Sequence, residues 1–158
     1  AARAGRPARL LFKMNALEDR DFTRLLYEAS AAGVKVDLVI RGICRLRPGV
    51  EGLSENVRVV SVIGRFLEHS RIYAFENGGN PEVFIGSADI MKRNLDERIE
   101  VLAPIKSREH QEQLLRLLED LLADQRQAWV LEDREWRRDN TTTTPGIHEQ
   151  LIAASPFS

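Results

Sequence analysis

The sequence predicts an α/β domain with a mixed sheet flanked by helices, and three observations support this fold class. Short apolar runs alternate with helically spaced apolar residues over positions 9–40. A dense turn signal at 76–81 separates two β-prone runs. An apolar stripe with charges opposite it marks a long helix at 109–126. At 158 residues, the chain is long enough to bury a core of its own.

The first three elements predict a parallel βαβ unit. Residues 9–14 (RLLFKM) read as a short buried strand, and the following helix is capped by Asp19 or Asp21 and ended by Gly33. Residues 34–40 (VKVDLVI) return as a second strand. A strand, a helix and a strand joined by short connections are typical of a parallel sheet.

Side chains beyond the carboxyl ends of these strands are the first functional candidates, because ligands of such sheets bind there. Lys13 and Asn15 stand at the end of the first strand, and Arg41 follows the second. We therefore expect all three at one edge of the sheet.

The remaining elements extend the sheet and cover it. Residues 56–62 alternate as a third strand, 71–85 form a hairpin and 98–105 add another strand. The helix at 109–126 is expected to pack on the sheet, and a small terminal hairpin occupies 128–138.

The domain is expected to cover residues 1–139, with a tail at 140–158. The tail carries weak signals and is either a short docking helix around 146–154 or frayed. Because the chain begins in a strand without a Met, we interpret it as a fragment of a longer protein.

The composition narrows the function classes. With a formal net charge of −1, the chain as a whole has no positive electrostatic potential that would indicate a nucleic acid or a membrane as its partner. No apolar run reaches the length of a membrane span. Cys44 is the single cysteine, which excludes a disulfide framework and fits the cytoplasm. Between residues 35 and 71, seven Lys and Arg stand against four Asp and Glu, so any basic site is local.

The stretch 64–75 carries the strongest candidate chemistry. His69 and Arg71 head a strand, and alternate residues of a strand point to the same face. An imidazole can attack phosphorus or pass a proton near neutral pH, and a neighbouring guanidinium can clamp phosphoryl oxygens. The alternative is a surface histidine at a loop–strand junction beside a solvated arginine.

Two further segments suit an anion. Ser87 follows a glycine at the end of a strand and offers a hydroxyl and backbone N–H groups to an anion. Alternatively, Ser87 or Asp89 caps the next helical turn. The loop at 41–49 is rich in arginine and glycine, which favours anion binding, or it is simply solvated.

Residues 69–71 (HSR), 86–89 (GSAD) and the later Glu100 together resemble the motif of the phospholipase D superfamily, which implies a phospholipase-D-like sheet. That motif runs His-x-Lys, four residues, Asp, then Gly-Ser-x-Asn and a later Glu. The chain departs from it at three positions, since Arg71 stands for Lys, Glu76 for Asp and Asp89 for Asn. These departures argue against generic phosphodiester hydrolysis.

A denser resemblance, over about residues 10–127, is to the C-terminal domain of polyphosphate kinase. It is carried by residues 12–17 (FKMNAL), 39–44 (VIRGIC), 46–50 (LRPGV), 52–56 (GLSEN), 64–71 (GRFLEHSR), 87–89 (SAD) and 93–96 (RNLD).

This resemblance implies a reversible transfer of the ATP γ-phosphate to inorganic polyphosphate through a phosphohistidine in a sister domain absent from this chain. It makes His69 the second, catalytic histidine, and it makes Arg41 and His69 the nucleotide contacts. Lys13, Asn15, Arg71 and Ser87 are the further candidates for phosphate contacts. Arg45, Arg47, Arg65 and Arg93 either line a polyphosphate track or are plain surface residues.

The resemblance also implies Mg²⁺ as a cofactor, although no metal ligand is expected in this chain. The full-length enzyme is expected to be cytoplasmic, with membrane association left open, and to form a homo-oligomer. The expected partners are ATP, inorganic polyphosphate and the sister domains, without a nucleic acid. The isolated fragment is expected to be inactive alone, because half of the active site is missing.

Two alternatives remain at this point. One is a phospholipase-D-like phosphodiester hydrolase completed by homodimerisation through the histidine face. The other is a non-catalytic module that binds phosphate or nucleotide, in which His69→Ala would change nothing.

Overall fold

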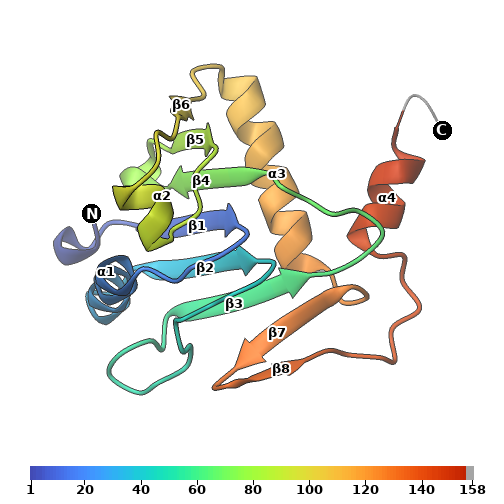
Figure 1. The fold of residues 1–158 in the computed structure, drawn as a ribbon, viewed down its shortest axis with the longest axis horizontal. Coiled ribbons are helices and arrows are strands. Elements are labelled where there is room, and N and C mark those ends of the chain that lie inside the picture. The colour runs from blue at the N-terminus through green and yellow to red at the C-terminus, as the bar shows by residue number, and fades with distance from the viewer. Residues whose placement is uncertain (156–158) are drawn as a thin grey trace.

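An eight-stranded mixed sheet organises residues 1–155, the part of the chain that the computed structural model describes (Figure 1). Its strand order is β6-β5-β4-β1-β2-β3-β7-β8. The strands are β1 (Arg9–Met14), β2 (Lys35–Ile40), β3 (Val57–Val62), β4 (Arg71–Phe75), β5 (Glu82–Gly86), β6 (Leu102–Pro104), β7 (Ala128–Glu132) and β8 (Glu135–Arg137). The helices are α1 (Arg20–Ala31), α2 (Lys92–Asp96), α3 (Arg108–Ala123) and α4 (Ile147–Ala153), with 3-10 turns at Ala2–Ala4 and Asn77–Gly79.

The predicted βαβ unit is confirmed. Strands β1, β2 and β3 are parallel, whereas β4, β5, β6, β7 and β8 each join the sheet through antiparallel pairs. The Asp19 carboxylate accepts the Phe22 N–H at 2.7 Å and so caps α1. Gly33 follows the end of α1 with a φ of 85°, a conformation that glycine adopts without a Cβ penalty.

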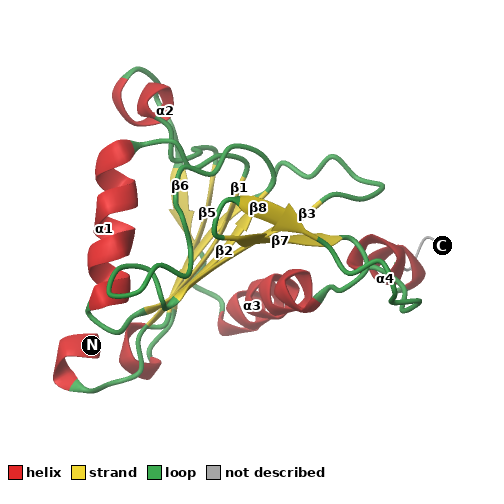
Figure 2. Ribbon diagram, turned by 90° about the horizontal axis from the view of Figure 1, so that it is seen from below, coloured by secondary structure: helices red, strands yellow, loops and turns green. Residues whose placement is uncertain are grey.

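Helices cover both faces of the sheet, α1 on one side and α3 on the other (Figure 2). Successive residues of β1 serve the two faces, since Phe12 packs with Leu26 of α1 in one core cluster and Leu11 packs with α3 in the other. Leu118 and Leu121 of α3 are completely buried, which confirms that this helix packs on the sheet.

Two elements differ from expectation in length. Strand β6 spans three residues only, because beyond Leu102 the ladder gives way to bonds that Ser87 makes with Val101. Helix α3 ends at Ala123, since the Asp124 carboxylate accepts the next N–H groups of the chain. The predicted terminal hairpin is present, and it extends the main sheet because β7 pairs with β3.

The tail forms the short helix α4, which the sequence left open, and α4 lies beside the loop that leaves β3 (Figure 1). A domain boundary at residue 139 stays a prediction. Within residues 1–155, no helix is both long and apolar enough to cross a membrane.

Candidate active site

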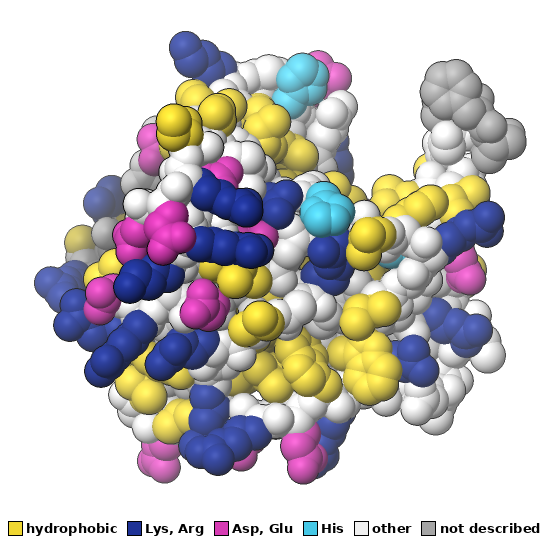
Figure 3. Space-filling view, viewed as in Figure 1, with side chains coloured by type: hydrophobic (Ala, Val, Ile, Leu, Met, Phe, Trp, Pro, Cys, Tyr) yellow, Lys and Arg dark blue, Asp and Glu magenta, His cyan; other side chains and the backbone are white. Residues whose placement is uncertain are grey.

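Five predicted residues meet at the edge where β1 and β2 end and β4 begins: Lys13, Asn15, Arg41, His69 and Arg71. The loop from 63 to 70, here called the histidine loop, leaves β3 and reaches this edge before β4 (Figure 1). Figure 3 shows a histidine and basic side chains together over the ends of these strands. The parallel order of β1 and β2 thus confirms that Lys13, Asn15 and Arg41 share one edge.

The first group at this edge is the Asp89 cluster, formed by Asn15, Arg71 and Asp89. Arg71 holds the carboxylate with two nitrogens, Nε at 3.3 Å from Oδ1 and Nη2 at 3.0 Å from Oδ2. The backbone N–H of Asn15 donates to Asp89 Oδ1 at 2.7 Å. Two of the departures from the phospholipase D motif, Arg71 and Asp89, are therefore partners of one another.

The backbone brings this cluster together. Leu17 forms parallel bridges with both Cys44 and Ile90, so the segment after β1 lies between the loops after β2 and β5. Asp89 is buried, and burial raises the pKa of its carboxyl group. The hydrogen bonds from Arg71 and Asn15 outweigh burial and lower that pKa below its usual value. Asp89 is thus an ionised anchor with its oxygens occupied, and it caps no helix, since Met91 precedes α2.

The second group is the Glu68 cluster, formed by Lys13, Glu68 and His148. Lys13 is 5% exposed, and its Nζ lies 2.8 Å from Glu68 Oε2 and donates to the Ser70 carbonyl at 3.2 Å. His148 Nε2 lies 2.9 Å from Glu68 Oε1. Burial raises the pKa of Glu68, but the hydrogen bond and charge of Lys13, followed by the contact with His148, lower it overall.

Arg41 approaches the histidine loop from the end of β2. Its Nη1 donates to the Glu68 carbonyl oxygen at 2.5 Å, and its own carbonyl accepts the Ser61 hydroxyl at 3.3 Å. A guanidinium carries five N–H donors, so this one bond leaves most of them for a ligand. Arg41 is half-buried, so contacts within the protein restrict the orientation of its side chain.

His69 is the exposed member of the site. Its backbone carbonyl accepts Arg71 Nη1 at 2.8 Å, whereas its imidazole has no hydrogen-bond partner among residues 1–155. Ionic and hydrogen bonds thus hold the residues on both sides of His69, namely Glu68 and Ser70, and leave the ring open. Such an imidazole is available to a ligand at this edge.

Ser87 is bound within the chain and does not cap a helix. Its hydroxyl donates to Glu100 and accepts the Val101 N–H at 3.1 Å, so it is already engaged and caps no helix. Asn94 donates to the same carboxylate at 2.6 Å. The hydrogen bonds of Ser87 and then Asn94 lower the pKa of Glu100. A phosphate contact by Ser87 stays a prediction, and it would require this hydroxyl to exchange partners.

Of the four further arginines, Arg47 lies away from the site, whereas a polyphosphate track along Arg45, Arg65 and Arg93 stays a prediction. Arg47 is bound to Asp133 in the turn between β7 and β8, at the opposite end of the sheet from His69. Arg45, Arg65 and Arg93 are exposed.

Sequence reasoning missed the roles of Glu68, Asp89 and His148. Glu68 lies inside the histidine stretch, and Asp89 was seen as a motif departure, so their positions were visible but their partners were not. His148 lies in the weakly patterned tail, 80 residues from Glu68, and no local signal connects the two.

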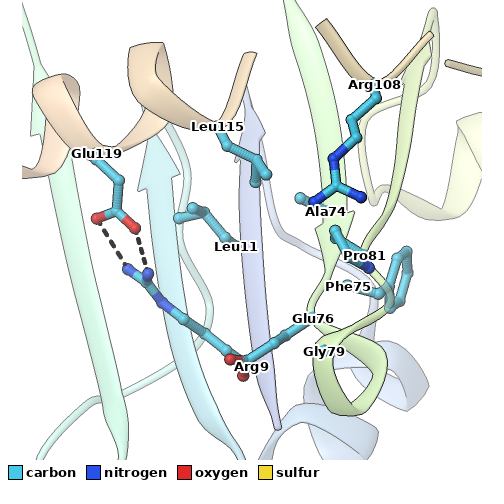
Figure 4. Close-up of a pocket in the computed structure, with 10 residues that line it drawn as sticks. All are labelled: Arg9, Leu11, Ala74, Phe75, Glu76, Gly79, Pro81, Arg108, Leu115 and Glu119. Atoms are coloured by element: carbon cyan, nitrogen blue, oxygen red, sulfur yellow. Dashed lines mark hydrogen bonds and ion pairs between the residues drawn. The ribbon is translucent and has the colours of Figure 1, made fainter. Parts of the chain in front are cut away.

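A pocket of about 390 Å³ lies at the other end of β1, between the sheet and α3 (Figure 4). Its floor is apolar, with Leu11, Ala74 and Leu115. Its Arg9 is bound by both carboxylate oxygens of Glu119 and by Asp37 at 2.6 Å. Because these charges are paired with each other, the pocket is not prepared for an anion as the histidine edge is.

Comparison with known proteins gives one consistent family. The family model for the polyphosphate kinase C-terminal domain 2 matches residues 1–150. A polyphosphate kinase of Thermosynechococcus vestitus is 58% identical over 156 residues, which is 96% of this chain and 21% of that protein. The chain therefore spans about a fifth of the length of this curated relative.

Solved structures agree with the fold. The polyphosphate kinase of Porphyromonas gingivalis superposes with a TM-score of 0.86 at 38% identity, over 95% of this chain and 23% of that chain. A phospholipase D family member, Nuc from Salmonella typhimurium, superposes with a TM-score of 0.58 at 16% identity, over 87% of each chain. The second likeness concerns the fold alone and confirms the expected phospholipase-D-like sheet.

Proposed function

The chain belongs to the polyphosphate kinase C-terminal domain 2 family, and from that premise we propose that it supplies the nucleotide side of an ATP:polyphosphate phosphotransferase. The observation that carries the proposal is the pairing of an open imidazole, His69, with Arg41 at one end of the histidine loop. The substrates would be ATP and inorganic polyphosphate. The full-length enzyme would be a cytoplasmic homo-oligomer completed by its sister domains.

The proposed reaction moves the γ-phosphoryl group of ATP. The bond between the γ-phosphorus and the β,γ-bridging oxygen breaks, a bond to a histidine nitrogen of the sister domain forms, and ADP leaves. The phosphohistidine then passes the group to the terminal oxygen of polyphosphate, and both steps run in reverse. Phosphoryl transfer depends mainly on positioning of the reactants and stabilisation of charge, and the side chains at this edge of the sheet could supply both.

Each residue of the edge has a defined part in this proposal. Arg41 would hold phosphate oxygens with the donors that Glu68 leaves unused. His69 would donate a proton or a hydrogen bond to the leaving ADP oxygen, or guide the attack by the sister histidine. Lys13 would contribute positive electrostatic potential, and Asn15 would help to position the backbone at the end of β1. The polar groups of both residues are already bound by the carboxylates of Glu68 and Asp89.

Mg²⁺ is implied by the family, but the described residues do not fit it. Within residues 1–155, no group of three or more His, Cys, Asp or Glu side chains could hold a metal ion. The two carboxylates of the edge, Glu68 and Asp89, are each bound to a cationic side chain. The proposed reaction therefore uses no metal ion held by this chain.

The hydrolase alternative fits this edge less well. Arg71 stands at the position of the motif lysine and is held in two places by Asp89. Because Arg71 also donates to the His69 carbonyl, about two of its five N–H donors are left for a phosphodiester, fewer than the three of a lysine ammonium.

The test is kinase activity of a full-length polyphosphate kinase that carries this domain. His69→Ala is expected to lower kcat by about 10²-fold or more, the usual scale for losing a general acid or base. His110→Ala is the matched control, because this exposed histidine lies at the start of α3. Equal activity of the two variants would overturn the assignment of His69.

A further inference from the structure

We propose that His148 of helix α4 is a positioning residue that holds the histidine loop in its active form. The inference rests on the proposed function, because it assigns the tail a part in that same site. His148 is completely buried, although α4 lies in the segment with the weakest sequence signals.

Both ring nitrogens of His148 bind the histidine loop. Nδ1 accepts the backbone N–H of Phe66 at 3.2 Å, and Nε2 lies 2.9 Å from Glu68 Oε1. Because Nδ1 is an acceptor, the proton of the neutral ring is on Nε2 and is donated to Glu68. One buried imidazole thus fixes the loop at two positions, 66 and 68.

The start of the loop is shaped to the imidazole. A Cβ on Gly64 would lie 2.5 Å from His148 Nδ1 and 2.6 Å from Nε2 of Gln127, a separation that requires the neighbours to shift. The Phe66 ring packs on the imidazole with a centroid distance of 5.1 Å. Gln127 Oε1 also accepts the backbone N–H of His148 at 3.2 Å, which ties α4 to the segment before β7.

Glu68 carries the effect of His148 to the reacting side. Its second carboxylate oxygen binds Lys13 at 2.8 Å, and its carbonyl oxygen accepts Arg41 Nη1 at 2.5 Å. Glu68 therefore lies between His148 on one side and two cations from β1 and β2 on the other. His69 is the next residue in the chain, so the orientation of its imidazole depends on how Glu68 is held.

A purely structural role would not require a histidine here. Burying a polar ring costs free energy unless hydrogen bonds compensate for it, and an apolar side chain of similar size would avoid that cost. Only Ile147 and His148 of α4 are buried, and both hydrogen bonds of the imidazole go to the histidine loop. The residue thus serves the loop more than it serves the helix.

The first test uses a full-length polyphosphate kinase with two substitutions of His148 and one control substitution elsewhere in α4. His148→Leu keeps the volume and removes both hydrogen bonds, and we expect kcat to fall by about 10-fold or more. His148→Gln places an amide N–H near Nε2 and restores the bond to Glu68, so it is expected to recover most of that loss. Leu151→Ala, on an exposed part of α4, is the control for docking of the helix and should keep wild-type kcat.

The second readout is hydrogen exchange of the Phe66 amide in the same enzyme. His148→Leu should accelerate that exchange at least 10-fold while amides of β1 keep their protection. Wild-type kcat and unchanged Phe66 exchange in His148→Leu would overturn the inference. If the wild-type enzyme lacks kinase activity, the proposed function fails, and the exchange measurement still decides whether His148 holds the loop.

Discussion

The Asp89 cluster and the Glu68 cluster lie at the same edge of the sheet, and each is built around one buried or half-buried carboxylate. In the Asp89 cluster, Arg71 and the carboxylate neutralise each other through two hydrogen bonds. In the Glu68 cluster, one carboxylate faces Lys13 and the neutral His148, while Arg41 binds only its carbonyl oxygen.

This difference in net charge indicates a structural role for the Asp89 cluster and a ligand-binding role for the Glu68 cluster. The Asp89 cluster has no net charge left, so it joins the loops after β1 and β5 and attracts an anion less strongly. The Glu68 cluster with Arg41 keeps one excess positive charge next to the open ring of His69. An anionic substrate should therefore bind on the Glu68 side, and two of the three departures from the phospholipase D motif, Arg71 and Asp89, belong to the neutral side.

The largest expected effect is on stability at Asp89. Asp89→Ala leaves the half-buried Arg71 guanidinium and the Asn15 N–H without their partner, and we expect a loss of about 3 to 5 kcal/mol in the free energy of unfolding. Denaturant unfolding measures it.

The double variant Arg71→Lys with Asp89→Asn sharpens this expectation, because it restores the residues of the superfamily motif at both positions. The pair should lose less stability than Asp89→Ala alone, with a coupling of about 1 kcal/mol or more between the two sites. Additive losses would show that the two departures are independent.

A smaller effect on stability, with a larger one on activity, is expected at Glu68. Glu68→Ala leaves Lys13 buried without its carboxylate, and we expect about 1 to 3 kcal/mol of lost stability. The histidine loop also loses one of its two bonds to His148, so kcat should fall more than in any variant of the Asp89 cluster with the same stability. Paired unfolding and activity measurements test this, and a greater activity loss in the Asp89 variants would reverse the comparison.

The smallest expected effect is the response to acid. The pKa values of Glu68 and Asp89 are both lower in the folded chain than their usual values. Their stabilisation is therefore complete above the unfolded pKa values, about 4.3 for Glu and 3.9 for Asp, and is lost as the pH falls through the lower folded values. Unfolding free energies measured between pH 3 and pH 6 should show a shallower acid slope in Glu68→Gln than in the wild type, whereas equal slopes would contradict this account.

Local patterns predicted most of the sheet, because strands such as β1 and β2 are short apolar runs with a capped helix between them. The edge strand β6 was predicted, but its length and the sheet position of β7 were not, since pairing with other strands decides both. The site followed the same division. The edge and its cations came from the parallel topology, whereas the contacts of Glu68 with His148 and of Arg71 with Asp89 depend on tertiary structure.

The measurement that tests the central claim most directly is a calorimetric titration of ATP into a full-length polyphosphate kinase that carries this domain, at physiological salt. At that ionic strength, unspecific attraction to surface cations is strongly screened. The account predicts that Arg41→Ala weakens ATP binding by about 10-fold or more, while Arg116→Ala, on the exposed side of α3, leaves it unchanged. Equal ATP affinity of the two variants would contradict the claim that the Glu68 side of this edge binds the nucleotide.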